Sequence, residues 1–434
     1  MAPSLRSRLA SAFPAHLFRR ITSGGALLAE LDGLRAVAIL PVVLFHATMS
    51  LYLKGAEGQV SAIDPTADPF QTPLGWLVSQ GFLGVQLFFV ISGFVVTLPF
   101  ARARLLGDAA PSLKGFYLKR VTRIEPPYVI ALCSYLAGVL LLAPENARIA
   151  DYLAGLVYLR TALFGSEPWA FFISWSLEIE VQFYLLAPLL ASVFWIRSTA
   201  LRRGVLVAAI ALTALHAADV RLSASEPPPL GGPLQHGRWL GTEIAFFLIG
   251  LLVADLWTLR EVRTGERIAS IGYDLGWCAG FIAVVTSYRV LAWHHLGIAL
   301  LVLGLFLMTL GAFRGHLVRR ALSVPLVSIV GGACYTIYLF HFQLVSLLGR
   351  FLAPFTTTSL EWNILVLALP FSLIVTAACL ALFPLVERPF MHARWPAIVA
   401  EAVRTRSLAA LGPLFEAPAT SFRRSGRPRS RSGG

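Results

Sequence analysis

The feature that most constrains this chain is a set of apolar runs, each about 20 residues long, that recur along its length. A helix rises about 1.5 Å per residue, so about 20 apolar residues cross the roughly 30 Å hydrocarbon core of a bilayer. We place ten such runs, at residues 34–53, 75–99, 125–143, 171–195, 204–220, 239–258, 272–290, 293–313, 325–349 and 363–386. The amphipathic, interrupted stretch 144–170 predicts a short interfacial or re-entrant element on the outer side.

The composition supports the same interpretation. The 434 residues are 57% hydrophobic and 14% charged, with a mean hydropathy of +0.72. Soluble domains are roughly half apolar and a quarter charged. The sequence therefore predicts an all-α integral membrane protein with about ten transmembrane helices. We expect a cytoplasmic N-terminal segment over 1–30, a transmembrane domain over 31–395 and a basic, disordered cytoplasmic tail over 396–434.

The positive charge of the chain is distributed unevenly. A net charge of +13 could suit a nucleic-acid-binding protein. However, alternating the ten spans places 29 of the 36 Lys and Arg residues on the side of the termini and 7 on the other side. Cytoplasmic loops of multi-pass membrane proteins carry such an excess. We therefore predict that both termini are cytoplasmic, as an even number of spans requires, and that the partner is the lipid bilayer rather than nucleic acid.

The first span carries two ionisable residues for which a lipid-facing helix has little use. Arg35 and His46 lie 11 positions apart, so they share one helical face and differ in depth by about 16 Å. Asp32 lies one turn before Arg35 and can pair with it. Alone, Arg35 would be a topology anchor and His46 a neutral histidine bonded to a neighbouring helix. Ionisable groups inside a membrane often face a functional cavity, which keeps a functional role open for both.

Other polar side chains interrupt later spans. Glu180 lies inside the fourth span, and His341 follows Tyr338 on one face of the ninth. Counted along their helices, His46, His341 and Glu180 all fall in the middle to outer half of the bilayer. Two imidazoles and a carboxylate at similar depth could supply a general base, a general acid and an orienting group, if they converge. The glycine-rich second span favours close helix packing, although its Ser92 could line a cavity.

The basic stretch KGFYLKRVTRIEPPY precedes the third span. Its Arg120 and Arg123 share a helical face. Two guanidinium groups side by side suit the oxygens of a phosphate, so this stretch could clamp an anionic ligand on the cytoplasmic side. The alternative is that these charges only set the topology.

Taken together, six motifs resemble those of the membrane-bound acyltransferase-3 family of bacterial integral membrane O-acyltransferases, and they occur in the family's order. They are Arg35 with His46, G-V-x-x-F-F-x-x-S-G-F at 84–94, R-x-x-R-I-x-P-x-Y at 120–128, W-S-L-x-x-E-x-x-F-Y at 175–184, Y-x-x-Y-L-x-H at 335–341 and E-x-P at 387–389. The resemblance spans about Leu31 to Pro389. Gln86 stands where Asp is frequent and Cys334 where Ser is usual, and neither departure touches a proposed catalytic group.

The resemblance implies an enzyme of the bacterial cytoplasmic (inner) membrane. It would move an acyl group, expected to be acetyl, from cytoplasmic acyl-coenzyme A to a hydroxyl of an extracytoplasmic glycan, which could be lipid-linked. No metal is expected.

The resemblance and the positions of the polar residues together suggest roles for eight side chains. His46 would be the general base, or a transient acyl carrier. Glu180 would orient or recharge an imidazole, and His341 would assist the acceptor or the leaving thiolate. The remaining residues would bind substrates: Arg35, Arg120 and Arg123 the coenzyme phosphates, and Tyr338 and Ser92 the reacting groups.

Two alternative functions stay open at the level of sequence. One is an acyltransferase that acts on a small molecule such as a macrolide. The other is a transporter or flippase whose buried histidine and glutamate residues relay protons. The absence of an evident internal repeat argues mildly against a transporter.

Overall fold

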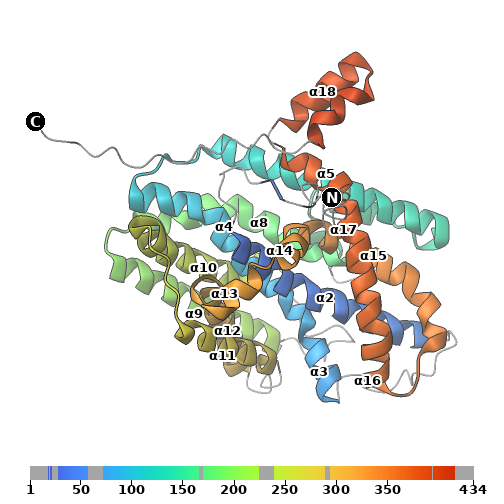
Figure 1. The fold of residues 1–434 in the computed structure, drawn as a ribbon, viewed down its shortest axis with the longest axis horizontal. Coiled ribbons are helices and arrows are strands. Elements are labelled where there is room, and N and C mark those ends of the chain that lie inside the picture. The colour runs from blue at the N-terminus through green and yellow to red at the C-terminus, as the bar shows by residue number, and fades with distance from the viewer. Residues whose placement is uncertain are drawn as a thin grey trace, which may run out of the picture.

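The structure is a computed structural model that describes residues 18, 20–21, 28–56, 72–165, 170–223, 239–288, 294–392 and 394–415. This part of the chain is a bundle of helices that contains no β-strand (Figure 1). The longer helices are α2 (Ala29–Ala56), α4 (Gly84–Leu106), α5 (Leu113–Leu142), α8 (Trp175–Leu190), α9 (Thr199–Ser223), α10 (Leu240–Trp257), α11 (Ile271–Ser287), α12 (His294–Arg314), α15 (Cys334–Leu352) and α17 (Leu369–Val386). The shorter α-helices are α3 (Pro73–Ser79), α6 (Ile149–Leu156), α7 (Arg160–Phe164), α13 (Leu317–Leu322), α14 (Pro325–Gly332), α16 (Leu360–Trp362) and α18 (Trp395–Thr405).

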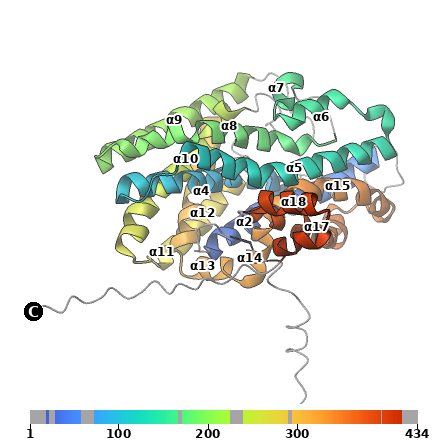
Figure 2. The same cartoon turned by 90° about the horizontal axis from the view of Figure 1, so that it is seen from above.

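The predicted membrane spans are present as helices. Within the described residues, nine helices are long and apolar enough to cross a bilayer. The remaining expected span is the shorter apolar helix α11, which packs along α12. The prediction of an all-α, multi-pass membrane protein with about ten spans is therefore confirmed. Between α5 and α8 the chain forms two short helices, where the sequence predicted an interrupted element. Helix α6 lies next to α5 in Figure 2, and α7 packs against α6 and α8.

Helix α2 occupies the centre of the bundle. It packs against α4, α12, α14, α15 and α17, which come from widely separated parts of the chain (Figure 1). A helix surrounded in this way must be apolar on nearly every side, as its sequence is. The neighbouring pair α4 and α10 depends on glycine, because a Cβ atom at Gly93 or Gly250 would overlap the backbone of the facing helix. This is the close packing that the glycine-rich second span predicted.

The ninth expected span, 325–349, is not one helix, and this corrects the sequence analysis. Helix α14 ends at Gly332, and α15 begins at Cys334. Two glycines in succession weaken a helix. Gly331 also lies against the backbone carbonyl of Asp32 in α2, where a Cβ atom would clash. His341 therefore belongs to the second turn of α15 and not to a helix that begins at Pro325.

The tail also differs from the sequence prediction. Residues 396–434 were expected to be disordered, but α18 covers Trp395–Thr405 and a 3-10 helix covers Leu408–Leu414. Helix α18 stands outside the main bundle in Figure 1. Its first residue is anchored, because the Trp395 Nε1–H donates to the Thr122 carbonyl at 2.9 Å. Residues 416–434, and nearly all of the predicted N-terminal segment, lie outside the described part of the chain.

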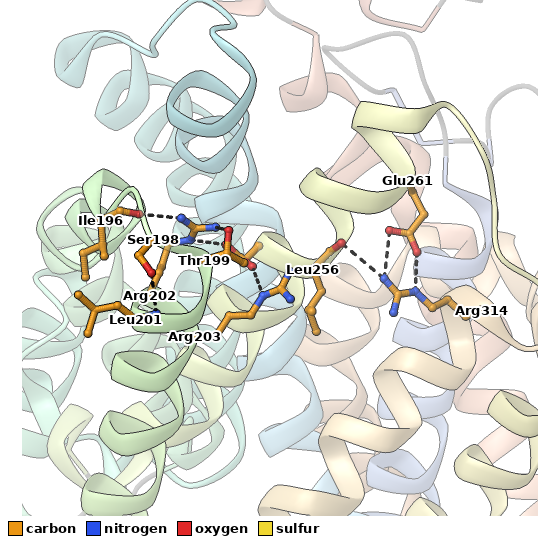
Figure 3. Close-up of polar contacts among 10 residues, drawn as sticks. Ile196, Ser198, Thr199, Leu201, Arg202, Arg203, Leu256, Glu261 and Arg314 are labelled. Carbon is orange, nitrogen blue, oxygen red and sulfur yellow. Dashed lines mark hydrogen bonds and ion pairs between the residues drawn. The ribbon is translucent and has the colours of Figure 1, made fainter.

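Part of the basic surplus on the predicted cytoplasmic side fastens helices to one another (Figure 3). Arg202 and Arg203 of α9 donate to the two carboxylate oxygens of Asp255 in α10, at 2.5 and 2.7 Å. Arg314 of α12 donates to Glu261 at 2.5 and 3.2 Å. Removing one partner of a buried pair leaves an uncompensated charge and costs about 3–5 kcal/mol. These arginines therefore hold helices together, in addition to the role in topology that the sequence predicts for them.

The two ends of the membrane domain lie at one face of the bundle. Arg20, which precedes α2, and Glu387, which follows α17, line the same cavity. This arrangement agrees with an even number of passes. The assignment of this face to the cytoplasm stays a prediction from the charge asymmetry.

Candidate functional site

A cavity of about 150 Å³ lies between α2, α4, α5, α8 and α15. Its polar lining falls into two groups. The arginine cluster consists of Arg20, Arg35, Arg120, Arg123 and Glu387. The hydroxyl cluster consists of Ser92, Ser176, Tyr184 and Tyr338 around Glu180. Apolar side chains of α4 line much of the remaining wall, so the cavity combines a cationic part with a surface suited to an apolar chain.

Two members of the arginine cluster share one carboxylate. Arg35 Nη1 donates to Asp32 Oδ1, one helical turn earlier, and Arg20 Nη1 donates to the same oxygen at 3.2 Å. Arg35 and Asp32 are both buried. Burial and the neighbouring charge of Arg35 lower the pKa of Arg20 from its ordinary value, while Asp32 opposes this shift.

The other two arginines have fewer partners. Arg120 and Arg123 form no ion pair with any described residue, and the buried Nε of Arg120 has no hydrogen-bond partner in that part of the chain. Glu387 is held by Thr336, whose backbone N–H and hydroxyl donate to Oε2 at 3.0 and 2.8 Å. Burial raises the pKa of Glu387, and Arg123 opposes the rise. Together with Asp32 and with Glu180, which also lines the cavity, three described carboxylates therefore stand against four guanidinium groups.

The hydroxyl cluster is organised around the carboxylate of Glu180. Ser92 of α4 and Tyr184, one turn along α8, both donate their hydroxyls to Glu180 Oε1. The guanidinium of Arg120 lies over the Tyr184 ring, 5.6 Å from its centroid, so the two clusters meet at this point. The two hydroxyls provide the polar partners that a carboxylate inside a membrane span requires.

Tyr338 connects the cavity to the two histidines. Its hydroxyl donates to the Ile173 carbonyl at 2.5 Å and lies 2.5 Å from Ser176 Oγ. Its ring centroid is 6.0 Å from that of His341, one turn later on α15. A group bound at the Tyr338 end of the cavity would therefore lie close to the histidine pair.

His46 and His341 form a hydrogen-bonded pair beside the cavity, from α2 and α15. His46 Nδ1 lies 2.9 Å from His341 Nε2, and the two rings stack with centroids 5.1 Å apart. Phe172 and Phe342 meet the His46 ring edge-on. His341 is fully buried, whereas His46 is partly exposed. The two histidines that the sequence placed in different spans therefore do converge.

The contacts of His341 fix the hydrogen positions of the pair. His341 Nδ1 lies 2.9 and 2.8 Å from the carbonyl oxygens of Ile337 and Tyr338, which can only accept. His341 Nδ1 must carry the hydrogen, so Nε2 of the neutral ring is an acceptor. His46 Nδ1 then donates to it, and the lone pair of His46 lies on Nε2. That nitrogen makes no hydrogen bond to a described residue, which leaves it able to take a proton.

The structure groups the predicted residues in two places. Six of them line the cavity: Arg35, Ser92, Arg120, Arg123, Glu180 and Tyr338. His46 and His341 form the adjacent pair. The expected contact between Glu180 and an imidazole is not found, since no hydrogen bond joins Glu180 to either histidine. In the described residues, no group of three or more His, Cys, Asp and Glu side chains is placed to hold a metal ion.

Sequence reasoning missed Arg20 as a cavity residue. The segment before the first span contains four arginines, and nothing in its pattern shows which of them folds back onto the bundle. Glu387 was recognised only as part of a motif. Its position directly after the last span was the available signal, because that position brings it to the face where α2 begins.

The fold and the site together define a multi-pass membrane protein whose helices enclose a cationic cavity next to a pair of histidines. A family model described as an acyltransferase domain matches residues 28–383. The chain therefore belongs to this acyltransferase family, the acyltransferase-3 family that its motifs predicted. No solved structure matches the chain.

Curated relatives include O-acetyltransferases of Staphylococcus aureus. The O-acetyltransferase OatA of Staphylococcus aureus strain NCTC 8325 / PS 47 is 23% identical over 335 residues, covering 73% of this chain and 50% of the relative. OatA of Staphylococcus aureus strain COL shows the same identity and coverage. The chain thus spans about half the length of the curated relatives it matches.

Proposed function

We propose that this protein transfers an acyl group, expected to be acetyl, from cytoplasmic acyl-coenzyme A to a hydroxyl of an extracytoplasmic glycan in the bacterial cytoplasmic membrane. The observation that carries the proposal is the juxtaposition of the cationic cavity with a histidine whose Nε2 lone pair has no partner among the described residues. Membership of the acyltransferase family and the names of the relatives support it.

The arginine cluster suits the donor. Coenzyme A carries several phosphate charges, and of the four guanidinium groups those of Arg120 and Arg123 have no carboxylate partner among the described residues. The apolar wall from α4 suits the pantetheine arm and acyl group. A donor bound with its phosphates at the arginine cluster would extend its thioester toward Ser176 and Tyr338, and the Tyr338 ring lies near that of His341.

The histidine pair suits the transfer step. The acceptor hydroxyl gives its proton to His46 Nε2, while its oxygen bonds to the thioester carbonyl carbon. The C–S bond breaks, coenzyme A leaves as a thiolate, and the imidazolium returns the proton to the sulfur. Acyl ester and free thiol result, so atoms and charges balance. His341 would hold the tautomer of His46 instead of contacting substrate, because its Nε2 is already bonded to His46. A transient acyl-His46 would use the same lone pair.

Two measurements test the proposal. Purified protein in lipid nanodiscs should release coenzyme A from radiolabelled acetyl-coenzyme A only when an acceptor is present, and His46→Ala should not. Mass spectrometry of surface polysaccharide should show the loss of acyl esters in a deletion strain. A transporter would consume no donor. An enzyme for a small-molecule acceptor would consume donor and leave the polysaccharide of the deletion strain unchanged.

A further inference from the structure

We infer that Arg20, from the segment that precedes the first membrane helix, is a donor-binding residue whose guanidinium contacts a phosphate of the acyl donor. The inference rests on the proposed function, since it takes the donor to be a phosphate-bearing acyl carrier. It adds a binding residue that lies outside the helical spans and outside every motif discussed above.

The position of Arg20 supports this role. Arg20 lines the cavity together with Arg35 and Arg123. The next residue, Ile21, packs against the apolar core. The Cβ of Arg20 lies over Gly332, at 3.6 Å from where a Cβ of that glycine would stand. The break between α14 and α15 thus provides the surface on which Arg20 rests.

The unused hydrogen-bonding capacity of Arg20 points to a ligand. A guanidinium has five N–H donors. In the described residues, Arg20 makes one side-chain hydrogen bond, from Nη1 to Asp32 Oδ1, an oxygen that also accepts from Arg35. Its side chain is only 18% exposed. Most of its N–H donors therefore have no acceptor among the described residues, although the side chain lines the cavity.

The structural arginine Arg202 provides a comparison, because each of its guanidinium nitrogens has an acceptor. Its Nε donates to Asp255, Nη1 to the Ile196 carbonyl and Nη2 to Thr199 Oγ1, so all three nitrogens are engaged (Figure 3). Among the described residues Arg20 has no such set of acceptors, and it lies near the cationic groups of Arg35 and Arg123. A bound phosphate would supply the missing acceptors, because its oxygens match the geometry of the guanidinium N–H groups. Its negative charge would also reduce the repulsion between the arginines.

The test uses the full chain in lipid nanodiscs with two donors, acetyl-coenzyme A and the phosphate-free acetyl-pantetheine. The variants are Arg20→Gln and Arg20→Lys. Arg404→Gln is the matched control, since Arg404 is 75% exposed, is paired with Glu401 and lies outside the cavity. We expect Arg20→Gln to raise the Kd and KM for acetyl-coenzyme A about tenfold, as the loss of a charged hydrogen bond does. The KM for acetyl-pantetheine and kcat should stay within about twofold, and Arg20→Lys should fall between.

Three results would overturn the account, and they are distinguishable. Equal affinity of wild type and Arg20→Gln for acetyl-coenzyme A would remove Arg20 from the donor site. An equal loss for both donors would show that the substitution disturbs the fold and not a phosphate contact. Wild-type protein that binds no acetyl-coenzyme A would instead overturn the proposed function, whatever the variants do.

Discussion

The arginine cluster and the histidine pair lie in one helical bundle, but their polar groups are satisfied to very different degrees. In the cavity, Arg120 and Arg123 have no carboxylate partner among the described residues. In the pair, both nitrogens of His341 and Nδ1 of His46 are hydrogen-bonded, which leaves one ring nitrogen without a partner in that part of the chain.

This difference in hydrogen bonding indicates that the arginine cluster binds a ligand and that the histidine pair takes part in the reaction. Buried polar groups in proteins are nearly always paired, so several unmatched cations in a cavity point to an anion that is not part of the chain. A pair that is bonded at every nitrogen except one is instead held in a single geometry, with one atom ready to accept a proton. The comparison therefore predicts that substitutions in the two regions will affect different kinetic constants.

The largest effect is expected at His46. His46→Gln keeps a polar side chain but cannot take a proton, so kcat should fall by roughly 10²–10⁴-fold while the KM for acetyl-coenzyme A stays near the wild-type value. Steady-state kinetics of protein in nanodiscs measures both constants. His295→Gln is the control, because His295 is an exposed histidine paired with Asp219. A near-normal kcat in His46→Gln would show that His46 is not the general base.

The next largest effect is expected in the cavity. Arg120→Gln combined with Arg123→Gln removes two cations, so the KM for acetyl-coenzyme A should rise about 100-fold, while kcat at saturating donor is largely preserved. Steady-state kinetics of the variant in nanodiscs measures both kcat and KM. The matched control is Arg102→Gln with Arg404→Gln, which removes the same charge from two exposed residues. A fall in kcat without a change in KM would break the distinction between the two regions.

A smaller effect is expected at His341, where two substitutions separate two roles. His341→Ala removes the acceptor for His46 Nδ1 and should lower kcat about 10- to 100-fold, because the tautomer and orientation of His46 are no longer fixed. His341→Gln offers an amide oxygen to the same N–H and should stay within about tenfold of wild type. If His341 itself transferred the proton, both variants would be equally inactive, and their pH–rate profiles would lack the same ionisation.

The smallest effect is expected at Glu180. In Glu180→Gln the amide oxygen can still accept from Ser92 and Tyr184, so activity should fall by less than about tenfold. A proton relay through Glu180 predicts a loss of two or more orders of magnitude, as acid–base residues show. Activity measured across pH distinguishes these outcomes. A large loss would show that Glu180 reaches an imidazole during turnover.

The sequence predicted the membrane helices, because these depend on the length of apolar runs. It did not predict features that depend on contacts between distant parts of the chain. The spans follow from runs of apolar residues, and Arg35 and His46 share a face because the helical repeat requires it. Helix α14 ends at Gly332, next to the close approach of Gly331 to Asp32, which is a contact between distant segments. The hydroxyl partners of Glu180 and the return of Arg20 to the bundle likewise depend on tertiary packing.

The central claim is that one cavity holds the donor with its phosphates on the arginine cluster and its acyl group beside the histidine pair. A cryo-EM structure with a hydrolysis-resistant acetyl-coenzyme A analogue tests it directly. We expect phosphate oxygens about 3 Å from guanidinium nitrogens of Arg120 or Arg123, and the acyl carbonyl at the Tyr338 end of the cavity, facing His46. An analogue bound with its phosphates outside the arginine cluster, or with its acyl group pointing away from His46, would contradict the account.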